Sequence, residues 1–132
     1  VEEHLSFNFT NNIVWFNSGS LLTSRWSQVK INSDNNCYWD VRTKDVRFDK
    51  ASFKEWQASG KDRHSVIANP EFANPETFDF MIKNKALMKK IGFKPFDYSL
   101  AGVYGSEEWK ALAGFDPLLS AKYDDVIRKF EK

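Results

Sequence analysis

Two stretches with one pattern decide the predicted fold: residues 11–15 read Asn-Asn-Ile-Val-Trp, and residues 35–39 read Asn-Asn-Cys-Tyr-Trp. The offset between them is 24 residues, within the range of roughly 20 to 50 residues that stacked repeats produce. Equivalent residues on stacked parallel strands lie about 4.8 Å apart, so we expect Asn12 and Asn36 to be neighbours whose amides hydrogen-bond along the stack. The alternative explanation is coincidence in an Asn-rich segment.

Short apolar or alternating segments predict further strands. Residues 5–16 alternate apolar and polar side chains, pause at two asparagines, and then run through β-branched and aromatic residues, which indicates two short strands around a corner. Residues 26–31 alternate again and predict a half-buried strand. The remaining strand predictions are residues 65–68, stopped by the following Asn and Pro70, and residues 78–82.

Capping residues mark where helices begin. Residues 52–55 read Ser-Phe-Lys-Glu and match a capping box, in which the first and fourth side chains satisfy each other's backbone N–H groups. We therefore assign structural roles to Ser52 and Glu55 and predict a helix over residues 53–59. A second helix is predicted over residues 85–91, capped by Asn84 and ended by Gly92.

The last 27 residues read as two helices. Ser106 caps the first, over residues 107–113, and Asp116 with Pro117 begins the longer second helix. The second helix has an apolar stripe, which we expect to lie against a sheet because such a helix is stable mainly through burial. The stripe consists of Leu119, Tyr123, Val126, Ile127 and Phe130.

Size and charge exclude several classes of protein. The 132 residues, 42% of them hydrophobic, suit one compact domain. Lys plus Arg (19) nearly balance Asp plus Glu (18), so no broad positive field is available for nucleic acid, and no apolar run is long enough to cross a membrane. The single cysteine, Cys37, excludes an internal disulfide and a zinc site of paired thiolates. The two histidines are far apart, and residues 34–36 lack the later acidic ligands of a calcium loop. We therefore expect neither a metal nor a cofactor, and a calcium site only if upstream coils contribute to it.

A longer motif carries a resemblance to a known family. Residues 53–72 contain the pattern aromatic-x-Glu-Trp-Gln-x-x-Gly-x-Asp-x-His-Ser and, after it, Asn-Pro-x-Phe. This segment resembles the C-terminal region of bacterial right-handed parallel β-helix proteins of the polysaccharide-degrading type, which are glycoside hydrolases or polysaccharide lyases. Asn69 departs from the family pattern, which has Asp before the proline, and residues 84–86 depart from it as well. With matches upstream and downstream, the resemblance covers about residues 5–110.

Together with the repeated pattern, the resemblance implies a mainly β chain: the last coils of a right-handed parallel β-helix, with short capping helices and a helical C-terminal tail. Terminal β-helix coils are expected in residues 1–50, a capping segment of short helices and strands in residues 51–105, and the helical tail in residues 106–132. The resemblance also implies that the chain is a fragment of a longer bacterial protein that is secreted or periplasmic.

A saccharide site needs flat apolar surfaces and, for hydrolysis, two carboxyl groups about 5 to 9.5 Å apart. Aromatic residues make up 16% of the chain, and we assign substrate contacts to Trp26, Trp39 and Asp40. Asp34 and Asp40 flank a predicted strand and are the candidate acids. The alternative is that Asp34 bonds locally in a turn and that the tryptophans only fill the core. No catalytic residue is therefore assigned within this chain.

Residues 62–65, Asp-Arg-His-Ser, unite an acid, a base and a hydroxyl, but residues this close in sequence rarely reach the geometry of a catalytic triad. We expect structural roles for Asp62, His64 and Ser65. The Asp62 and Ser65 side chains should bind backbone amides, and His64 should donate to a carbonyl.

The sequence thus predicts the C-terminal portion of a carbohydrate-active enzyme that hydrolyses or lyses polysaccharide, with its catalytic residues upstream of this chain. The alternative is a non-catalytic carbohydrate-binding, interaction or capping module whose aromatic residues contact glycan. The expected partner is a polysaccharide or oligosaccharide, not nucleic acid or a membrane. A first coil with unpaired backbone groups also predicts self-association through its exposed edge.

Overall fold

The computed structural model describes residues 3–23, 26–98, 101–114 and 117–130, and the chain separates into two units, Val1–Pro95 and Phe96–Lys132. No helix among these residues is long and apolar enough to cross a membrane.

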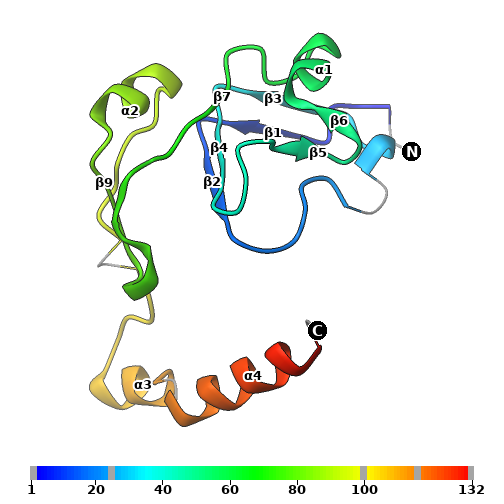
Figure 1. The fold of residues 1–132 in the computed structure, drawn as a ribbon. Coiled ribbons are helices and arrows are strands. Elements are labelled where there is room, and N and C mark those ends of the chain that lie inside the picture. Colours follow the sequence, from blue (N-terminus) through cyan, green and yellow to red (C-terminus); the bar gives the residue numbers. More distant parts are fainter. Residues whose placement is uncertain (1–2, 24–25, 99–100, 115–116, 131–132) are drawn as a thin grey trace. The chain divides into compact units, whose positions relative to one another are not determined.

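The second unit contains α3 (Glu107–Leu112) and α4 (Pro117–Phe130). The elements of the first unit (Figure 1) are, in order, β1 (Phe7–Thr10), β2 (Ile13–Phe16), the 3₁₀ turn η1 (Trp26–Gln28), β3 (Ile31–Asp34), β4 (Cys37–Asp40), β5 (Arg47–Phe48), β6 (Ala51–Ser52), α1 (Phe53–Ala58), β7 (Val66–Ile67), β8 (Phe72–Asn74), the 3₁₀ turn η2 (Pro75–Thr77), β9 (Asp79–Ile82) and α2 (Lys85–Ile91).

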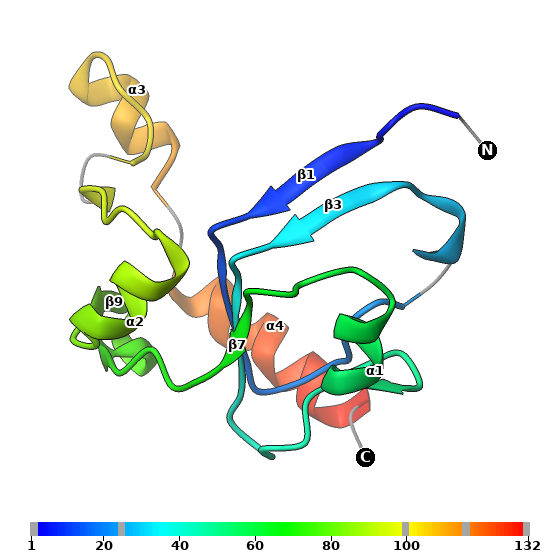
Figure 2. The ribbon, with the colours of Figure 1, turned by 90° about the horizontal axis from the view of Figure 1, so that it is seen from above.

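Two pairs of parallel strands have a register in which paired residues are 24 positions apart, the same offset that separates the two copies of the sequence pattern. β1 pairs with β3, beside which it lies in Figure 2, and β2 pairs with β4, so that Trp15 is opposite Trp39. At the corner between the strands, the backbone N–H and the side-chain amide of Asn12 both donate to Oδ1 of Asn36, at 2.9 and 3.1 Å. Asn12 and Asn36 are therefore neighbours on adjacent parallel strands, as the repeated pattern predicts.

The prediction of a mainly β chain made of the last coils of a right-handed parallel β-helix is nevertheless wrong. The described chain is mixed α/β, about 31% helical and 25% strand, and its strands are divided among four small sheets, two of them antiparallel. In this part of the chain the parallel pairing continues only in β7, which has two residues, and in one isolated bridge between Leu21 and Phe48. Asn69-Pro70 follows β7 closely, and proline has no N–H to donate to a ladder. The described residues therefore form no solenoid, and the division at residues 50 and 105 stays a prediction.

The strand predicted over residues 26–31 is also wrong, because residues 26–28 form η1 and β3 begins at Ile31. The repeat itself gives the reason: β1 requires a partner 24 residues further on, and that partner is β3.

The predicted helix starts are present. In α1, the Ser52 hydroxyl accepts the Glu55 N–H, and the Glu55 carboxylate accepts the Ser52 N–H at 2.7 Å, which completes the capping box. In α2, the Asn84 side chain accepts the N–H of Leu87.

The end of α2 is tied to the first corner of the chain. The helix ends at Gly92, whose φ of 65° lies in the left-handed region. The side-chain amide of Asn11 donates to the carbonyl of Ile91 at 2.6 Å. A Cβ atom at position 92 would lie 2.9 Å from that amide nitrogen, so both the backbone conformation and the close approach require glycine.

Strand β4 divides the core, because successive side chains of a strand lie on opposite faces. On one side Tyr38 packs in a cluster that we call the interior cluster, and its ring meets that of Phe48 edge to face at 4.9 Å. On the other side Cys37 packs against Leu87 and Ile91 of α2. The interior cluster consists of Tyr38, Val46, Phe48 and Trp56.

A buried carboxylate joins these elements. Asp62 is 0% exposed, and its oxygens accept hydrogen bonds from five side chains, none of them a cation. The expectation that Asp62 and Ser65 bind backbone amides in the loop after α1 is therefore wrong. Asp62 accepts from side chains, and the Ser65 hydroxyl accepts the N–H of Asn36, in the corner before β4, at 2.7 Å. The donors to Asp62 are Ser33 Oγ (2.8 Å), Asn36 Nδ2 (2.9 Å), Tyr38 Oη (3.1 Å), Trp56 Nε1 (2.7 Å) and Ser65 Oγ (2.6 Å).

In the second unit, the Ser106 hydroxyl accepts the N–H of Trp109 at 3.3 Å and begins α3, as predicted. The predicted cap Asp116 lies outside the described residues. The apolar stripe of α4 has side chains that are 42% to 84% exposed, and its burial against a sheet stays a prediction.

Replacing Asp62 should destabilise the first unit strongly. The Asp62→Ala substitution leaves five buried donors without an acceptor, and we expect the free energy of unfolding to fall by about 3 kcal/mol or more in urea titrations. Asp45→Ala is the matched control, because Asp45 is 63% exposed and pairs only with the exposed Arg47 in the described chain, so its removal should change stability little. Equal unfolding midpoints for the two variants would contradict the role given to Asp62.

Candidate functional site

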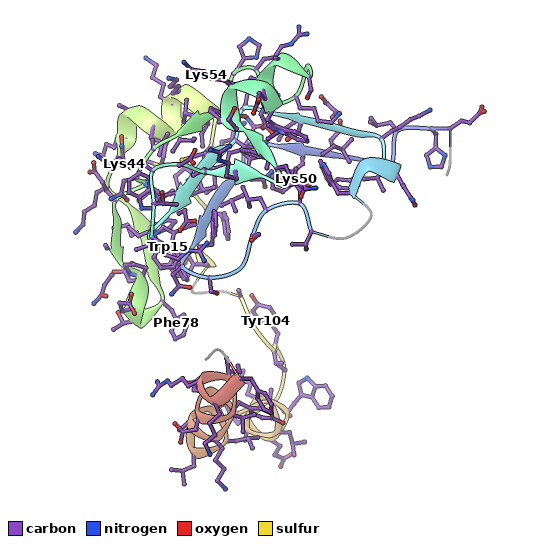
Figure 3. All side chains as sticks on the ribbon, turned by 45° about the vertical axis from the view of Figure 1, so that its right-hand side comes forward. Trp15, Lys44, Lys50, Lys54, Phe78 and Tyr104 are labelled. Carbon is purple, nitrogen blue, oxygen red and sulfur yellow. The ribbon has the colours of Figure 1, made fainter. Side chains whose placement is uncertain are left out.

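A groove of about 480 Å³ opens on the first unit where β2 meets the hairpin of β8 and β9. Four aromatic rings line it, and Asn17 and Glu76 supply its polar side chains. Figure 3 labels two of the aromatic residues, Trp15 on β2 and Phe78 between η2 and β9. We call this feature the aromatic groove; its rings are those of Trp15, Phe72, Phe78 and Phe80.

The four rings form one continuous series of edge-to-face contacts. The Trp15 and Phe72 centroids are 6.5 Å apart with planes at 64°, those of Phe72 and Phe80 are 5.3 Å apart at 79°, and those of Phe78 and Phe80 are 6.4 Å apart at 65°. This is the arrangement that the charge distribution of aromatic rings favours. Mutual contact holds the rings in place while their remaining surfaces face the groove.

Local structure brings these rings together from two parts of the chain. Alternation along β2 puts Ile13 and Trp15 on the face away from the interior cluster. Pro75 starts η2, and the turn ends at Phe78 with φ 61° and ψ 20°. A bulky residue in this left-handed conformation costs about 1 to 3 kcal/mol. Because Phe78 is also 77% exposed, its ring gains little from burial, and strain of this kind marks candidate functional positions.

The structure does not bring the predicted contact residues together. Trp26 lies on η1 and packs against Trp56 of the interior cluster, with ring centroids 5.6 Å apart. Trp39 follows Tyr38 in β4 and so lies on the opposite face of the sheet, next to Trp15 of the aromatic groove. A saccharide role for Trp39 stays a prediction.

Asp40 is 6% exposed and is bound by its neighbour Arg42. The guanidinium donates to both carboxylate oxygens, at 2.9 and 2.8 Å, and these hydrogen bonds hold the pKa of Asp40 below its ordinary value although burial opposes them. Asp40 therefore lies in a local ion pair and not in the aromatic groove.

The residues of the aromatic groove are not among those predicted from the sequence. Two signals were present: Trp15 belongs to the repeated pattern, and Phe78 and Phe80 alternate with a polar residue. Neither signal indicates that β2 meets a hairpin about 60 residues further along the chain.

His64 contacts a carboxylate and not a carbonyl, so that expectation is wrong. Its ring Nδ1 lies 2.6 Å from one oxygen of Asp34, and its backbone N–H donates to the other at 2.7 Å. Burial raises the pKa of Asp34, but the hydrogen bonds from His64 and from the Asn35 N–H outweigh it, so the pKa lies below its ordinary value. Asp34 is thus held in a structural pair that joins the end of β3 to the loop before β7.

Neither a metal centre nor a reactive thiol is found in the described ranges. No group of three or more His, Cys, Asp and Glu side chains there could hold a metal ion. Cys37 is 0% exposed, and burial raises the pKa of its thiol to about 11. Since the thiolate is the reactive form, this thiol is inert at neutral pH.

Comparison with family models, curated proteins and solved structures finds no match to this chain. The resemblance of residues 53–72 to polysaccharide-degrading proteins therefore stays a prediction.

Removing the His64 ring should raise the pKa of Asp34. In His64→Ala the carboxylate loses one of its hydrogen-bond partners while burial still disfavours its charge, so we expect its pKa to rise from the depressed value towards the ordinary aspartate pKa. A ¹³C NMR titration of the carboxyl groups measures this shift. In the unaltered chain, the depressed pKa stabilises the fold above the ordinary aspartate pKa, and this stability is lost as the pH falls through the folded-state value. Arg63→Ala is the neighbouring control, and an unchanged Asp34 titration in His64→Ala would refute the pairing.

Proposed function

We propose that this chain binds saccharide in the aromatic groove. The observation that carries the proposal is the series of four rings with free surface beside one amide and one carboxylate. The apolar face of a pyranose ring packs on an aromatic plane as other apolar surfaces do, and a few polar groups fix its orientation. The strained, exposed Phe78 supports the same interpretation.

Binding fits the residues of this chain better than catalysis. Hydrolysis of a glycosidic bond needs two facing carboxyl groups, whereas Glu76 is the acid that lines the groove. Asp34 and Asp40 are engaged by His64 and Arg42.

A portion of a carbohydrate-active enzyme is the second candidate, and the motif in residues 53–72 favours it. In that case the groove would hold polysaccharide while other residues perform the chemistry. A secreted or periplasmic location belongs to this second proposal.

Titration with soluble xylan, mixed-linkage β-glucan and polygalacturonate, followed by tryptophan fluorescence and calorimetry, tests the binding proposal. We expect Trp15→Ala and Phe78→Gly each to weaken binding at least about tenfold, which corresponds to about 1.4 kcal/mol. Phe78→Gly removes the ring but suits the left-handed backbone, so the stability of this variant should be unchanged or higher.

Tyr104→Ala serves as the control, because Tyr104 is an aromatic residue of the second unit that is 69% exposed. Its affinity for each polysaccharide should equal that of the unaltered chain. Binding that survives both groove substitutions, or no binding to any of the three polymers, would refute the proposal.

A further inference from the structure

The outer edge of β1 carries backbone groups that no described strand pairs. β1 has β3 on one side, and no strand among the described residues joins the sheet on the other. Asn11, just after β1, donates its N–H to the carbonyl of Asp34 at 3.4 Å. Because alternate residues of a strand face the same neighbour, the N–H groups of Phe7 and Phe9 point toward β3, and those of Asn8 and Thr10 point away from it. Such an edge is a ready template for another strand.

An apolar cavity of about 230 Å³ opens beside this edge. Phe7 and Phe9 of β1 line it together with Trp26 and with Tyr38 of the interior cluster. Phe7 is 47% exposed, so the edge and the cavity form one surface with both unpaired backbone groups and uncovered apolar side chains. Covering both at once would remove an exposed apolar surface of the kind that marks protein contacts.

This surface continues an interface that the chain already forms within itself. β1 packs on β3 through matched residues, among them Asn8 and Asn32, whose side chains hydrogen-bond at 2.9 Å. The outer side of β1 offers the same kind of strand edge that β3 offers to β1. A strand of similar composition therefore fits it.

The absence of charge along this edge favours a second copy of the chain as its partner. Residues 5–24 contain no Asp, Glu, Lys or Arg, although charged side chains are the usual protection of an exposed strand edge. Two copies of this edge can therefore approach without like-charge repulsion. A strand from a charged partner would instead bring charges that have no counterpart on this surface.

We infer that two copies of this chain associate through the outer edges of β1, paired antiparallel about a two-fold axis. Antiparallel pairing follows from the symmetry, because a two-fold axis across the edge reverses the second strand. The paired Asn8 and Thr10 backbone groups then close the sheet, and the two apolar cavities cover each other. The association is independent of saccharide binding in the aromatic groove.

Sedimentation velocity of the full chain from about 5 to about 500 µM tests the inference, because a dimer must form with rising concentration. Phe7→Lys places a charge at the edge of each copy and should weaken the dimer at least about tenfold. Met81→Lys, at an apolar residue of the same unit that is 63% exposed, is the control and should leave the dimer unchanged.

Hydrogen exchange on the unaltered chain gives a second readout that does not depend on how a variant folds. The amides of Asn8 and Thr10 should gain protection as concentration rises, while the amide of Phe9, which faces β3, should not. A strict monomer at the highest concentration, a dimer that Phe7→Lys does not weaken, or a mass that grows without limit through head-to-tail stacking would each overturn the inference.

Discussion

The first unit depends on how one buried carboxylate is satisfied. Asp62 lies in the interior without a cation, and its charge is held by five neutral donors. These donors come from β3, from the corner before β4, from β4 itself, from α1 and from the loop before β7. An unpaired charge in an apolar interior is so costly that every donor must be in place. The carboxylate therefore fixes the position of α1 relative to the two parallel strand pairs.

Much of the local structure could be predicted, because its signals are local. The repeated Asn-Asn pattern predicted the register of the parallel strands, and the Ser52 and Asn84 caps predicted where two helices begin. The extent of the stacking could not be predicted in the same way. Whether β7 extends into a full parallel strand depends on where a proline stops it and on the antiparallel hairpin of β8 and β9 that follows. From the repeated pattern alone we expected more stacked parallel strands than the described chain forms.

The functional surfaces were harder to predict, because contacts between distant segments create them. Asp62, His64 and Ser65 suggested a local arrangement, whereas the donors to Asp62 include residues 24 to 29 positions away. The aromatic groove likewise needs β2 beside the β8–β9 hairpin, and no periodicity in either segment indicates that meeting. Aromatic excess alone could not distinguish Trp26, which packs in the core, from Trp15, which lines the groove.

The hydrogen bond between the Asn11 side chain and the Ile91 carbonyl has a consequence for synthesis of the protein. It joins positions 80 residues apart, and closure over so long a span is slow compared with the formation of neighbouring turns. On the ribosome, the first corner of the chain emerges long before the helix end that it must bind. β1 and β2 can pair with β3 and β4 as soon as those strands emerge, so the hydrogen bond between the first corner and the end of α2 forms after the parallel strands have paired.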